Sequence, residues 1–369
     1  MKTNAAVLTG GRRPWEIMEV DLADPQPGEV LIRVEVAGLC HSDEHAKYSP
    51  IPYPTIGGHE GAGVVEAVGE GVRSVAVGDH VGVSWIPSCG KCRWCLTGQS
   101  NLCDLGANIM TGELANGGFR FSLDGTGLGA SAATGTFSQW AVVDERSVVK
   151  VDPELPLEWI SLVTCAVATG WGSVVNAGRV QPGDAVVIYG CGGIGVNAVQ
   201  AAIDAHAGVV AVVDPIQWKR DYAKGLGADF TYASAGEAHA DLWERTGGVG
   251  ADLAVVTVGK VNAEVVEAAF HLTRKGGTIV LTGVSDDIAE TTIKLPGSLL
   301  TLFQKKIVGS LYGNCNPRVD IPRLLTMAKN GKLKLDGLVT ARYSLDEINL
   351  GYDDLLAGKN LRGVIVHEH

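Results

Sequence analysis

The chain has 369 residues, of which 46% are hydrophobic, enough to fill the cores of two domains of ordinary size. Its formal net charge is -11, and its lysines and arginines form no dense run. A nucleic acid or an anionic membrane would need a clustered basic surface, so the composition argues against both partners.

We expect a cytoplasmic protein. The N-terminal stretch lacks the long apolar segment of a secretory signal, and no run reaches the 18 apolar residues of a membrane span. In that compartment the eight cysteines are expected as thiols and metal ligands rather than as disulfides.

Short apolar runs broken by Gly, Pro and Asp make up the chain to about residue 165. Residues 29–38, EVLIRVEVAG, and 61–72, GAGVVEAVGEGV, alternate apolar and polar positions as half-buried strands do. This part of the chain is therefore predicted to be a mainly β domain, either a barrel or a sandwich.

Four cysteines lie within fifteen residues of this first part, in the stretch SCGKCRWCLTGQSNLC. A C-x2-C-x2-C-x7-C spacing lets one loop present four thiolates at the corners of a tetrahedron, as a closed structural zinc site requires. An iron–sulfur cluster and a pair of disulfides are the alternatives. Zinc is favoured, and its ligands would be Cys89, Cys92, Cys95 and Cys103.

From about residue 170 to 300, strand-like runs alternate with helical stretches. AVVIY at 185–189 is followed by IGVNAVQAAIDAH at 194–206 and then by GVVAVVD at 208–214. Near-continuous Val and Ile runs in a βαβ order predict a buried parallel sheet with helices on both faces. Beyond residue 305, DIPRLLTMAKNGKLK at 320–334 predicts an amphipathic helix, and LRGVIVHEH at 361–369 a last strand.

A glycine-rich turn follows the first strand of this second part. Its G-x-G-x-x-G pattern allows a tight turn and a close backbone approach to a pyrophosphate at the helix N-terminus. A second strand ends in Asp214, whose carboxylate favours the ribose diol of NAD over the phosphate of NADP, and Lys219 is near enough to contact the same ribose. The alternative is a structural turn with Asp214 as a helix cap. The candidate glycines are Gly190, Gly192, Gly193 and Gly195.

Residues of a second metal site are scattered through the first part of the chain. Cys40, His59 and Cys165 together would bind zinc and leave a fourth position open, as a catalytic metal requires. Taken singly, a cysteine is usually core filling and a histidine a hydrogen-bonded polar residue, and spacing alone does not unite the three.

The motifs occur in the order of a known family. CHSDEH at 40–45, GGHEGAGVVEAVGEGV at 57–72, the four-cysteine lobe and GCGGIG with its trailing Asp resemble the medium-chain zinc-dependent alcohol dehydrogenases over essentially the whole chain. The stretches IPSCGKC, NLCDLGA, GTFSQWAVV and PIQWKRD further resemble the bacterial nicotinoprotein branch, which is assayed with the acceptor N,N-dimethyl-4-nitrosoaniline.

The resemblance implies two zinc ions per subunit, a catalytic one on Cys40, His59 and Cys165 and a structural one on the four-cysteine lobe. Asp43 would hydrogen-bond His59, and Glu60 would lie behind the metal. Ser42 and His45 match the proton relay of the family.

It also implies contacts to cofactor and substrate. His41 and Arg362 would reach the pyrophosphate of NAD(H), and Ile194 would press on the nicotinamide face away from the substrate. His41 stands where many relatives carry arginine, and its charge is weaker than that of a guanidinium. Trp85 would narrow the substrate pocket beside the zinc.

The implied fold is α/β, with a Rossmann doubly wound parallel sheet and a mainly β, GroES-like catalytic domain. The expected bounds are 1–166 with 310–369 for the catalytic domain, 88–104 for its zinc lobe, and 167–309 for the NAD-binding domain. A homo-oligomer, either a dimer or a tetramer, is expected.

The implied function is oxidation of a primary aliphatic or aromatic alcohol to its aldehyde by hydride transfer to NAD. The cofactor would stay bound and be reoxidised by a second substrate or an electron-acceptor partner. An ordinary dehydrogenase that exchanges NAD, a thiol-dependent formaldehyde dehydrogenase and, from another class, a catalytically silent binding protein are the alternatives.

Overall fold

A computed structural model describes residues 1–284 and 292–369, and the chain divides into two compact units. The first unit contains Met1–Cys165 and Asn316–His369, and the second contains Ala166–Cys315.

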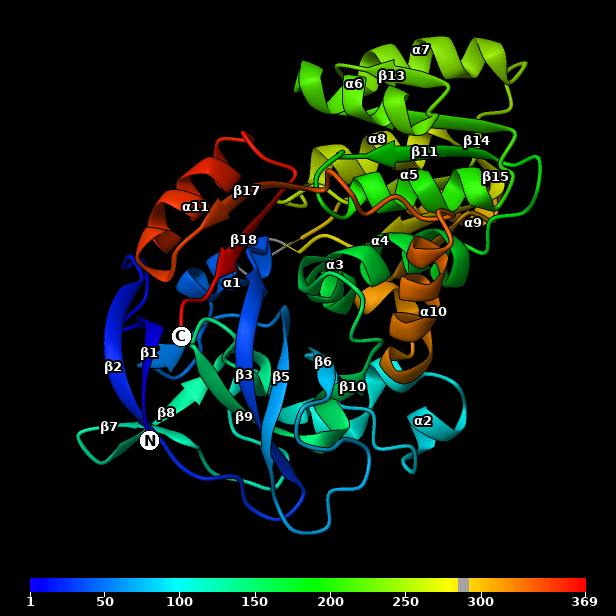
Figure 1. Ribbon diagram of the computed structural model, residues 1–369. Helices are drawn as coiled ribbons and strands as arrows, with labels where there is room; N and C mark the ends of the chain where they lie inside the picture. Colours follow the sequence, from blue (N-terminus) through cyan, green and yellow to red (C-terminus); the bar gives the residue numbers. More distant parts are fainter. Residues whose placement is uncertain (285–291) are drawn as a thin grey trace. The chain divides into compact units, whose positions relative to one another are not determined.

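The first unit is mainly β. A closed barrel has the strand order β1-β2-β7-β8-β4, and a mixed sheet has the order β10-β6-β5-β3-β18-β17, with β9 paired to β3. In Figure 1 the long strands β3 and β5 run side by side, as their antiparallel register requires. The strands are β1 (Lys2–Leu8), β2 (Glu16–Leu22), β3 (Glu29–Gly38), β4 (Thr55–Ile56), β5 (Gly61–Val68), β6 (His80–Val83), β7 (Phe121–Leu123), β8 (Thr126–Ala130), β9 (Trp140–Asp144), β10 (Val148–Lys150), β17 (Val339–Tyr343) and β18 (Arg362–Val366).

Short helices connect these strands, and two longer ones come from the C-terminal part of the chain. They are α1 (His41–His45), η1 (Ala46–Tyr48), α2 (Arg93–Leu96), η2 (Ser100–Leu102), η3 (Asp104–Met110), η4 (Ser131–Ala133), η5 (Glu145–Ser147), α3 (Leu157–Leu162), α10 (Pro317–Lys329), η9 (Leu345–Glu347) and α11 (Ile348–Leu356). A π-helical turn, η6 (Val163–Val167), follows α3 and includes the boundary between the units.

Alternation along β3 explains the core of the first unit. Val30, Ile32 and Val34 are fully buried, and the residues between them are partly exposed. The buried side chains join one hydrophobic cluster with residues of the other strands, while Arg33 and Glu35 on the opposite face are partly exposed. The period of two read from the sequence thus selects the face that packs.

The second unit is a parallel sheet with the strand order β13-β12-β11-β14-β15-β16. Its strands are β11 (Ala185–Tyr189), β12 (Val209–Val213), β13 (Phe230–Tyr232), β14 (Ala251–Val256), β15 (Thr273–Leu281) and β16 (Lys306–Gly309). Its helices are α4 (Ala168–Gly172), η7 (Ser173–Ala177), α5 (Gly195–Asp204), α6 (Gln217–Leu226), α7 (Ala235–Arg245), α8 (Ala263–Leu272), α9 (Gly297–Leu302) and η8 (Tyr312–Asn314).

Strand order in this sheet reverses between β11 and β14. The connection from β11 through α5 leads to β12 on one side, and the connection from β14 through α8 leads to β15 on the other. Because such crossovers are right-handed, opposite directions place helices on opposite faces. The predicted fold class, a doubly wound parallel domain together with a mainly β domain, is confirmed.

The amphipathic helix predicted over 320–334 lies at Pro317–Lys329, as α10, so its predicted bounds were wrong at both ends. The Asn316 side chain accepts the Arg318 N–H at the helix start, and Pro317 occupies the first turn. Gly331 has a φ of +69°, a left-handed conformation that ends the helix before the last predicted residues.

Within the described residues, one helical stretch, Leu157–Ala177, has the length and apolar composition to cross a membrane. Of its most apolar 18-residue window, 83% is buried inside the protein, so most of that apolar surface is already packed.

Candidate active site

Cys40, His59, Glu60 and Cys165 converge in the first unit. One donor atom from each lies within 4.8 Å of those of the other three, and all four residues are buried. Cys40 follows β3, His59 and Glu60 lie between β4 and β5, and Cys165 is in the π-helical turn η6. Two thiols and an imidazole at this separation suit tetrahedral zinc, so the residues fit the metal that the sequence analysis expects there.

The interactions within this cluster favour the protonated forms of Cys165 and His59 and the thiolate form of Cys40. A hydrogen bond from Cys165 lowers the pKa of Cys40 well below its usual value, whereas that same bond and burial raise the pKa of Cys165. Burial disfavours the charged form of His59, but Asp43 and the Cys40 thiolate together raise its pKa well above its usual value. Zinc binding needs deprotonated ligands, so it would release protons from this cluster.

Asp43 orients the imidazole of His59. Its Oδ2 lies 2.9 Å from His59 Nδ1, and its Oδ1 accepts hydrogen bonds from Gly58 N at 3.2 Å and Ser131 Oγ at 3.0 Å. With Nδ1 facing the carboxylate, Nε2 is the nitrogen left for a metal. The Trp85 ring stands nearly perpendicular to the His59 ring, with centroids 5.9 Å apart.

Glu60 and Arg362 form a buried ion pair beside the cysteine ligands. Arg362 Nη2 contacts Glu60 Oε2, and the two residues are 4% and 0% exposed. Burial raises the pKa of Glu60 to about 7, although the Arg362 charge opposes that shift. The carboxylate therefore interacts with an arginine and also has an oxygen within reach of a metal.

Helix α1 carries the remaining residues of the CHSDEH motif. The Ser42 hydroxyl lies 3.6 Å from Cys40 Sγ, and Ser42 is exposed to solvent. His45 is buried, and its ring lies 6.3 Å from the half-buried His41 ring, centroid to centroid. The motif thus places a hydroxyl next to a candidate metal ligand and an imidazole one helical turn further on.

The four cysteines of the lobe also converge. The Sγ atoms of Cys89 and Cys95 are 3.9 Å apart, and those of Cys92 and Cys103 are 4.0 Å apart. A tetrahedron of thiolates around one zinc, with Zn–S bonds of about 2.3 Å, places sulfurs about 3.8 Å apart. All eight cysteines, each within the described residues, are free, as ligands of a metal need to be.

The surroundings of the lobe shift the pKa values of two of its thiols in opposite directions. The N–H groups of Cys95 and Asp104 lower the pKa of Cys92 to about 6, which favours the thiolate. Burial raises the pKa of Cys103 to about 12, so this thiol keeps its proton unless a positive ion is near.

In the second unit the glycine loop follows β11, next to the point where strand order reverses. Gly190 has a φ of +93°, and a Cβ there would lie 3.0 Å from the backbone of Val258. A Cβ on Gly195, the first residue of α5, would lie 1.9 Å from the Gly190 carbonyl oxygen. Gly192 has open space around its Cβ position, which leaves room for a ligand. This is the position at which open α/β sheets bind dinucleotides.

Asp214 lies against this loop. Its Oδ2 accepts the Cys191 N–H at 2.7 Å, and its Oδ1 accepts the Ile216 N–H at 2.8 Å. Lys219 is 9% exposed, and its Nζ lies 5.6 Å from the centroid of the Trp218 ring. Ile194 is the half-buried residue before α5, and the Gly193 carbonyl accepts a hydrogen bond from Asn197 Nδ2 at 2.8 Å.

Three loop residues that the sequence analysis overlooked support these sites. Thr257, directly after β14, donates its hydroxyl to the Gly190 carbonyl at 2.7 Å. Ser131 contacts Asp43, and Thr136 donates its hydroxyl to the Glu60 carbonyl at 3.0 Å. A polar residue directly after a buried strand was a usable signal for Thr257, but nothing in the local sequence pointed to the other two.

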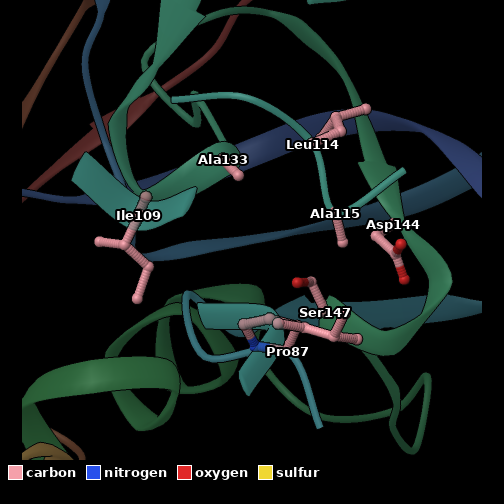
Figure 2. A pocket seen from close by; sticks show the side chains of 9 residues that line it. Pro87, Ile109, Leu114, Ala115, Ala133, Asp144 and Ser147 are labelled. Carbon is pink, nitrogen blue, oxygen red and sulfur yellow. The ribbon is translucent and has the colours of Figure 1, made fainter. Parts of the chain in front are cut away.

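A small pocket beside the cysteine lobe carries no catalytic groups (Figure 2). Its charged residue, Asp144, is already paired with Arg146. The lining residues are Pro87, Leu105, Ile109, Leu114, Ala115, Ala132, Ala133, Asp144 and Ser147.

A cluster of candidate metal ligands with a histidine–carboxylate pair, a cysteine lobe and a glycine loop of the nucleotide-binding type are the features of a metal-dependent dehydrogenase. Family models agree: residues 26–153 match the alcohol dehydrogenase GroES-like domain, and residues 193–330 match the zinc-binding dehydrogenase domain. The chain belongs to the medium-chain zinc-dependent alcohol dehydrogenase family, whose members bind zinc and use a NAD-type cofactor.

Three relatives illustrate the match. The NDMA-dependent alcohol dehydrogenase of Amycolatopsis methanolica is 52% identical over 100% of this chain and 99% of its own. Alcohol dehydrogenase B of Mycobacterium tuberculosis is 46% identical over 99% of this chain and 98% of its own. The benzyl alcohol dehydrogenase structure from Acinetobacter calcoaceticus superposes with a TM-score of 0.91 at 30% identity and covers both chains completely.

Proposed function

We propose that this protein oxidises primary alcohols to aldehydes, with zinc bound by Cys40, His59 and Cys165 and with NAD as hydride acceptor. The convergence of those three side chains in one buried cluster carries the proposal. The four-cysteine lobe would hold a second, structural zinc, which gives two per subunit.

When bound, zinc would lower the pKa of an alcohol hydroxyl, and NAD would accept the hydride. Ser42 would accept the hydroxyl proton as it releases its own, since it lies next to Cys40 and is exposed to solvent. His45 would pass the proton onward, because one imidazole nitrogen can accept a proton while the other donates one. Asp43 keeps the His59 ring fixed in this process.

Trp85 would limit the substrate. Its ring lies 5.9 Å from that of His59, so its bulk stands next to the metal ligand. A narrow site favours a primary alcohol, aliphatic or aromatic, over a sugar.

NAD would bind at the glycine loop formed by Gly190, Gly192, Gly193 and Gly195. The Asp214 carboxylate would accept the ribose hydroxyls and repel the phosphate of NADP. Lys219 would contact the same ribose, Ile194 the nicotinamide, and His41 and Arg362 the pyrophosphate. Arg362 is already paired with Glu60, so its positive charge would interact with both the Glu60 carboxylate and the pyrophosphate of NAD.

The cofactor would remain bound between turnovers and be reoxidised by a second substrate or an electron-acceptor partner. The 52% identity with the NDMA-dependent enzyme over the full chain supports this form over one that exchanges NAD freely. The ordinary NAD-exchanging dehydrogenase is the second candidate, because it would use the same zinc cluster and the same loop.

The protein would act in the cytoplasm as a homo-oligomer. Within the described residues, β16 is an edge strand paired only to β15, and the nearby Leu302 is 73% exposed. An exposed edge with an apolar neighbour is a surface that proteins usually cover. Light scattering on the purified protein in solution would give the number of subunits.

One experiment tests the function. Protein purified and dialysed without added cofactor is denatured, and its released NAD(H) and its zinc are quantified on the same sample. Near one NAD(H) and two zincs per subunit, with alcohol-driven reduction of an artificial acceptor, supports the bound-cofactor enzyme. Cofactor-free protein that needs added NAD supports the exchanging enzyme, and protein without zinc and without turnover overturns both.

A further inference from the structure

The segment Ser131–Phe137, which we call the clamp segment, links β8 to β9 and bonds to the backbone on both sides of His59. Phe137 N donates to the Gly57 carbonyl at 3.0 Å, and Thr136 N donates to the Gly58 carbonyl at 3.1 Å. On the other side, Thr136 Oγ1 donates to the Glu60 carbonyl at 3.0 Å. The backbone that carries His59 is therefore fixed before and after that residue.

The fit at Gly58 is tight. Its φ is +87°, and a Cβ there would lie 2.5 Å from Phe137 N and 2.6 Å from Thr136 Oγ1. Glycine is required both by the backbone conformation and by the close approach of the clamp segment.

Ser131 adds a side-chain contact to these backbone bonds. Its hydroxyl donates to Asp43 Oδ1 at 3.0 Å, and Gly58 N donates to that same oxygen at 3.2 Å. Two donors on Oδ1 fix the rotation of a carboxylate that is 1% exposed, so that Oδ2 faces His59 Nδ1 at 2.9 Å.

An unusual backbone conformation follows Ser131. Ala132 and Ala133 have φ values of 50° and 58°, and two successive alanines in the left-handed region cost about 1–2 kcal/mol each. Thr134 closes this turn, because its N–H and its hydroxyl both donate to the Ser131 carbonyl, at 3.0 and 2.9 Å. Both alanines also line the small pocket, and Figure 2 shows Ala133 among the labelled residues. Backbone strain of this kind concentrates where the surrounding structure needs one particular geometry.

We propose that Ser131 is a positioning residue of the zinc site, held in place by the strained turn after it, and that it acts on His59 through the Asp43 carboxylate. This inference rests on the proposed zinc site. Loss of the Ser131 hydroxyl leaves Asp43 with one fewer donor, which frees the carboxylate to rotate and loosens the His59 ring. Partners of this kind typically change metal affinity or activity by about 10- to 100-fold.

The test compares Ser131→Ala with Ser74→Ala. Ser74 also donates its hydroxyl to a carboxylate, Glu145 Oε2 at 3.3 Å, so it is a matched control away from the cluster. Zinc-loaded holoenzyme is incubated with a chelator and an alkylating reagent, and peptide mass spectrometry follows each cysteine. In S131A, Cys40 and Cys165 should be alkylated about 10-fold faster than in wild type. The four lobe cysteines, and all cysteines of S74A, should react as in wild type.

A second pair separates the hydroxyl from the shape of the side chain. Thr and Val have the same shape, so Ser131→Thr should protect Cys40 as wild type does, whereas Ser131→Val should behave as S131A does. The melting temperature is recorded alongside, because a merely structural role would deprotect both cysteine clusters together. This pair also replaces S131A if that variant does not fold.

Equal protection of Cys40 in S131A, S131V and wild type would overturn the inference. A different result would point to the proposed function instead: if zinc gives wild-type Cys40 and Cys165 no protection, the zinc assignment fails, whatever Ser131 does.

Discussion

Arg362 and Glu60 are paired inside the first unit although they lie 302 positions apart in the sequence. A Cβ on the neighbouring Gly38 would lie 2.1 Å from Glu60 Oε2, so glycine makes room for the pair. Both charges are removed from water, and each depends on the other for compensation.

Removing one charge of this pair is expected to be costly. Arg362→Met should lower the free energy of unfolding by about 3–5 kcal/mol, because it leaves Glu60 buried and uncompensated. Urea unfolding measures the change. The control is Arg342→Met, which removes an exposed pair with Glu158 and should cost about 0–1 kcal/mol. Equal losses in the two variants would mean that the buried pair has no special role in stability.

The cysteine lobe should be needed for stability more than for chemistry. Cys95→Ser is expected to lower zinc content from two to one per subunit and to lower the melting temperature by about 5–10 °C, with turnover per folded molecule nearly unchanged. Elemental analysis, calorimetry and activity on the same sample check this. Cys191→Ala, which removes a thiol outside both clusters, should keep its full zinc content.

His45 should affect the pH dependence of the rate. His45→Ala removes the proposed proton acceptor on α1, so turnover should fall most at low pH, where solvent is a poor substitute base. The pH–rate profile of the alcohol-dependent reaction measures the effect. His239→Ala, at an exposed position on α7, serves as the control. A profile that keeps its wild-type shape in H45A would exclude His45 from the relay.

Asp214 should govern the choice of cofactor. Asp214→Asn removes the charge and keeps one accepting oxygen, so it can still accept from one of the Cys191 and Ile216 N–H groups, which now bond to separate carboxylate oxygens. NAD affinity should fall by about 10-fold, and discrimination against NADP should weaken, because charge-assisted bonds contribute about 1.5–3 kcal/mol. Calorimetric titration of cofactor-free protein gives both constants. Asp229→Asn removes a charge that accepts the Val210 N–H at 2.8 Å, and it should leave both constants unchanged.

His367 should make the fold sensitive to acid. Burial lowers the pKa of His367 to about 4, and its Nε2 lies 3.0 Å from the Thr136 carbonyl oxygen. The unfolded chain, with a histidine pKa of about 6.5, therefore binds a proton that the folded protein does not.

The stability due to neutral His367 is fully present above pH 6.5 and is lost as the pH falls toward 4. The loss amounts to about 3 kcal/mol. Urea unfolding at several pH values measures it, and His367→Gln should flatten that part of the profile. The same slope in H367Q would assign the acid sensitivity to other groups.

Local sequence determined the features that depend on neighbours along the chain. Four cysteines within fifteen residues are held close by the loop itself, and alternation along β3 selects its buried face. The strand, glycine turn and helix around Gly190 follow from propensities within about twenty residues. The fold class was predictable for this reason, and so were the cysteine cluster and the loop geometry.

Only the tertiary structure decided which distant residues meet. Cys40, His59 and Cys165 stand at separate places in the sequence, and they converge because the mixed sheet and the π-helical turn η6 bring them together. Ser131 reaches Asp43 across 88 positions, and Arg362 reaches Glu60 because β18 pairs with β3. Such contacts depend on strand pairing and on the packing of the whole unit, which leave no periodic or local signal in the chain.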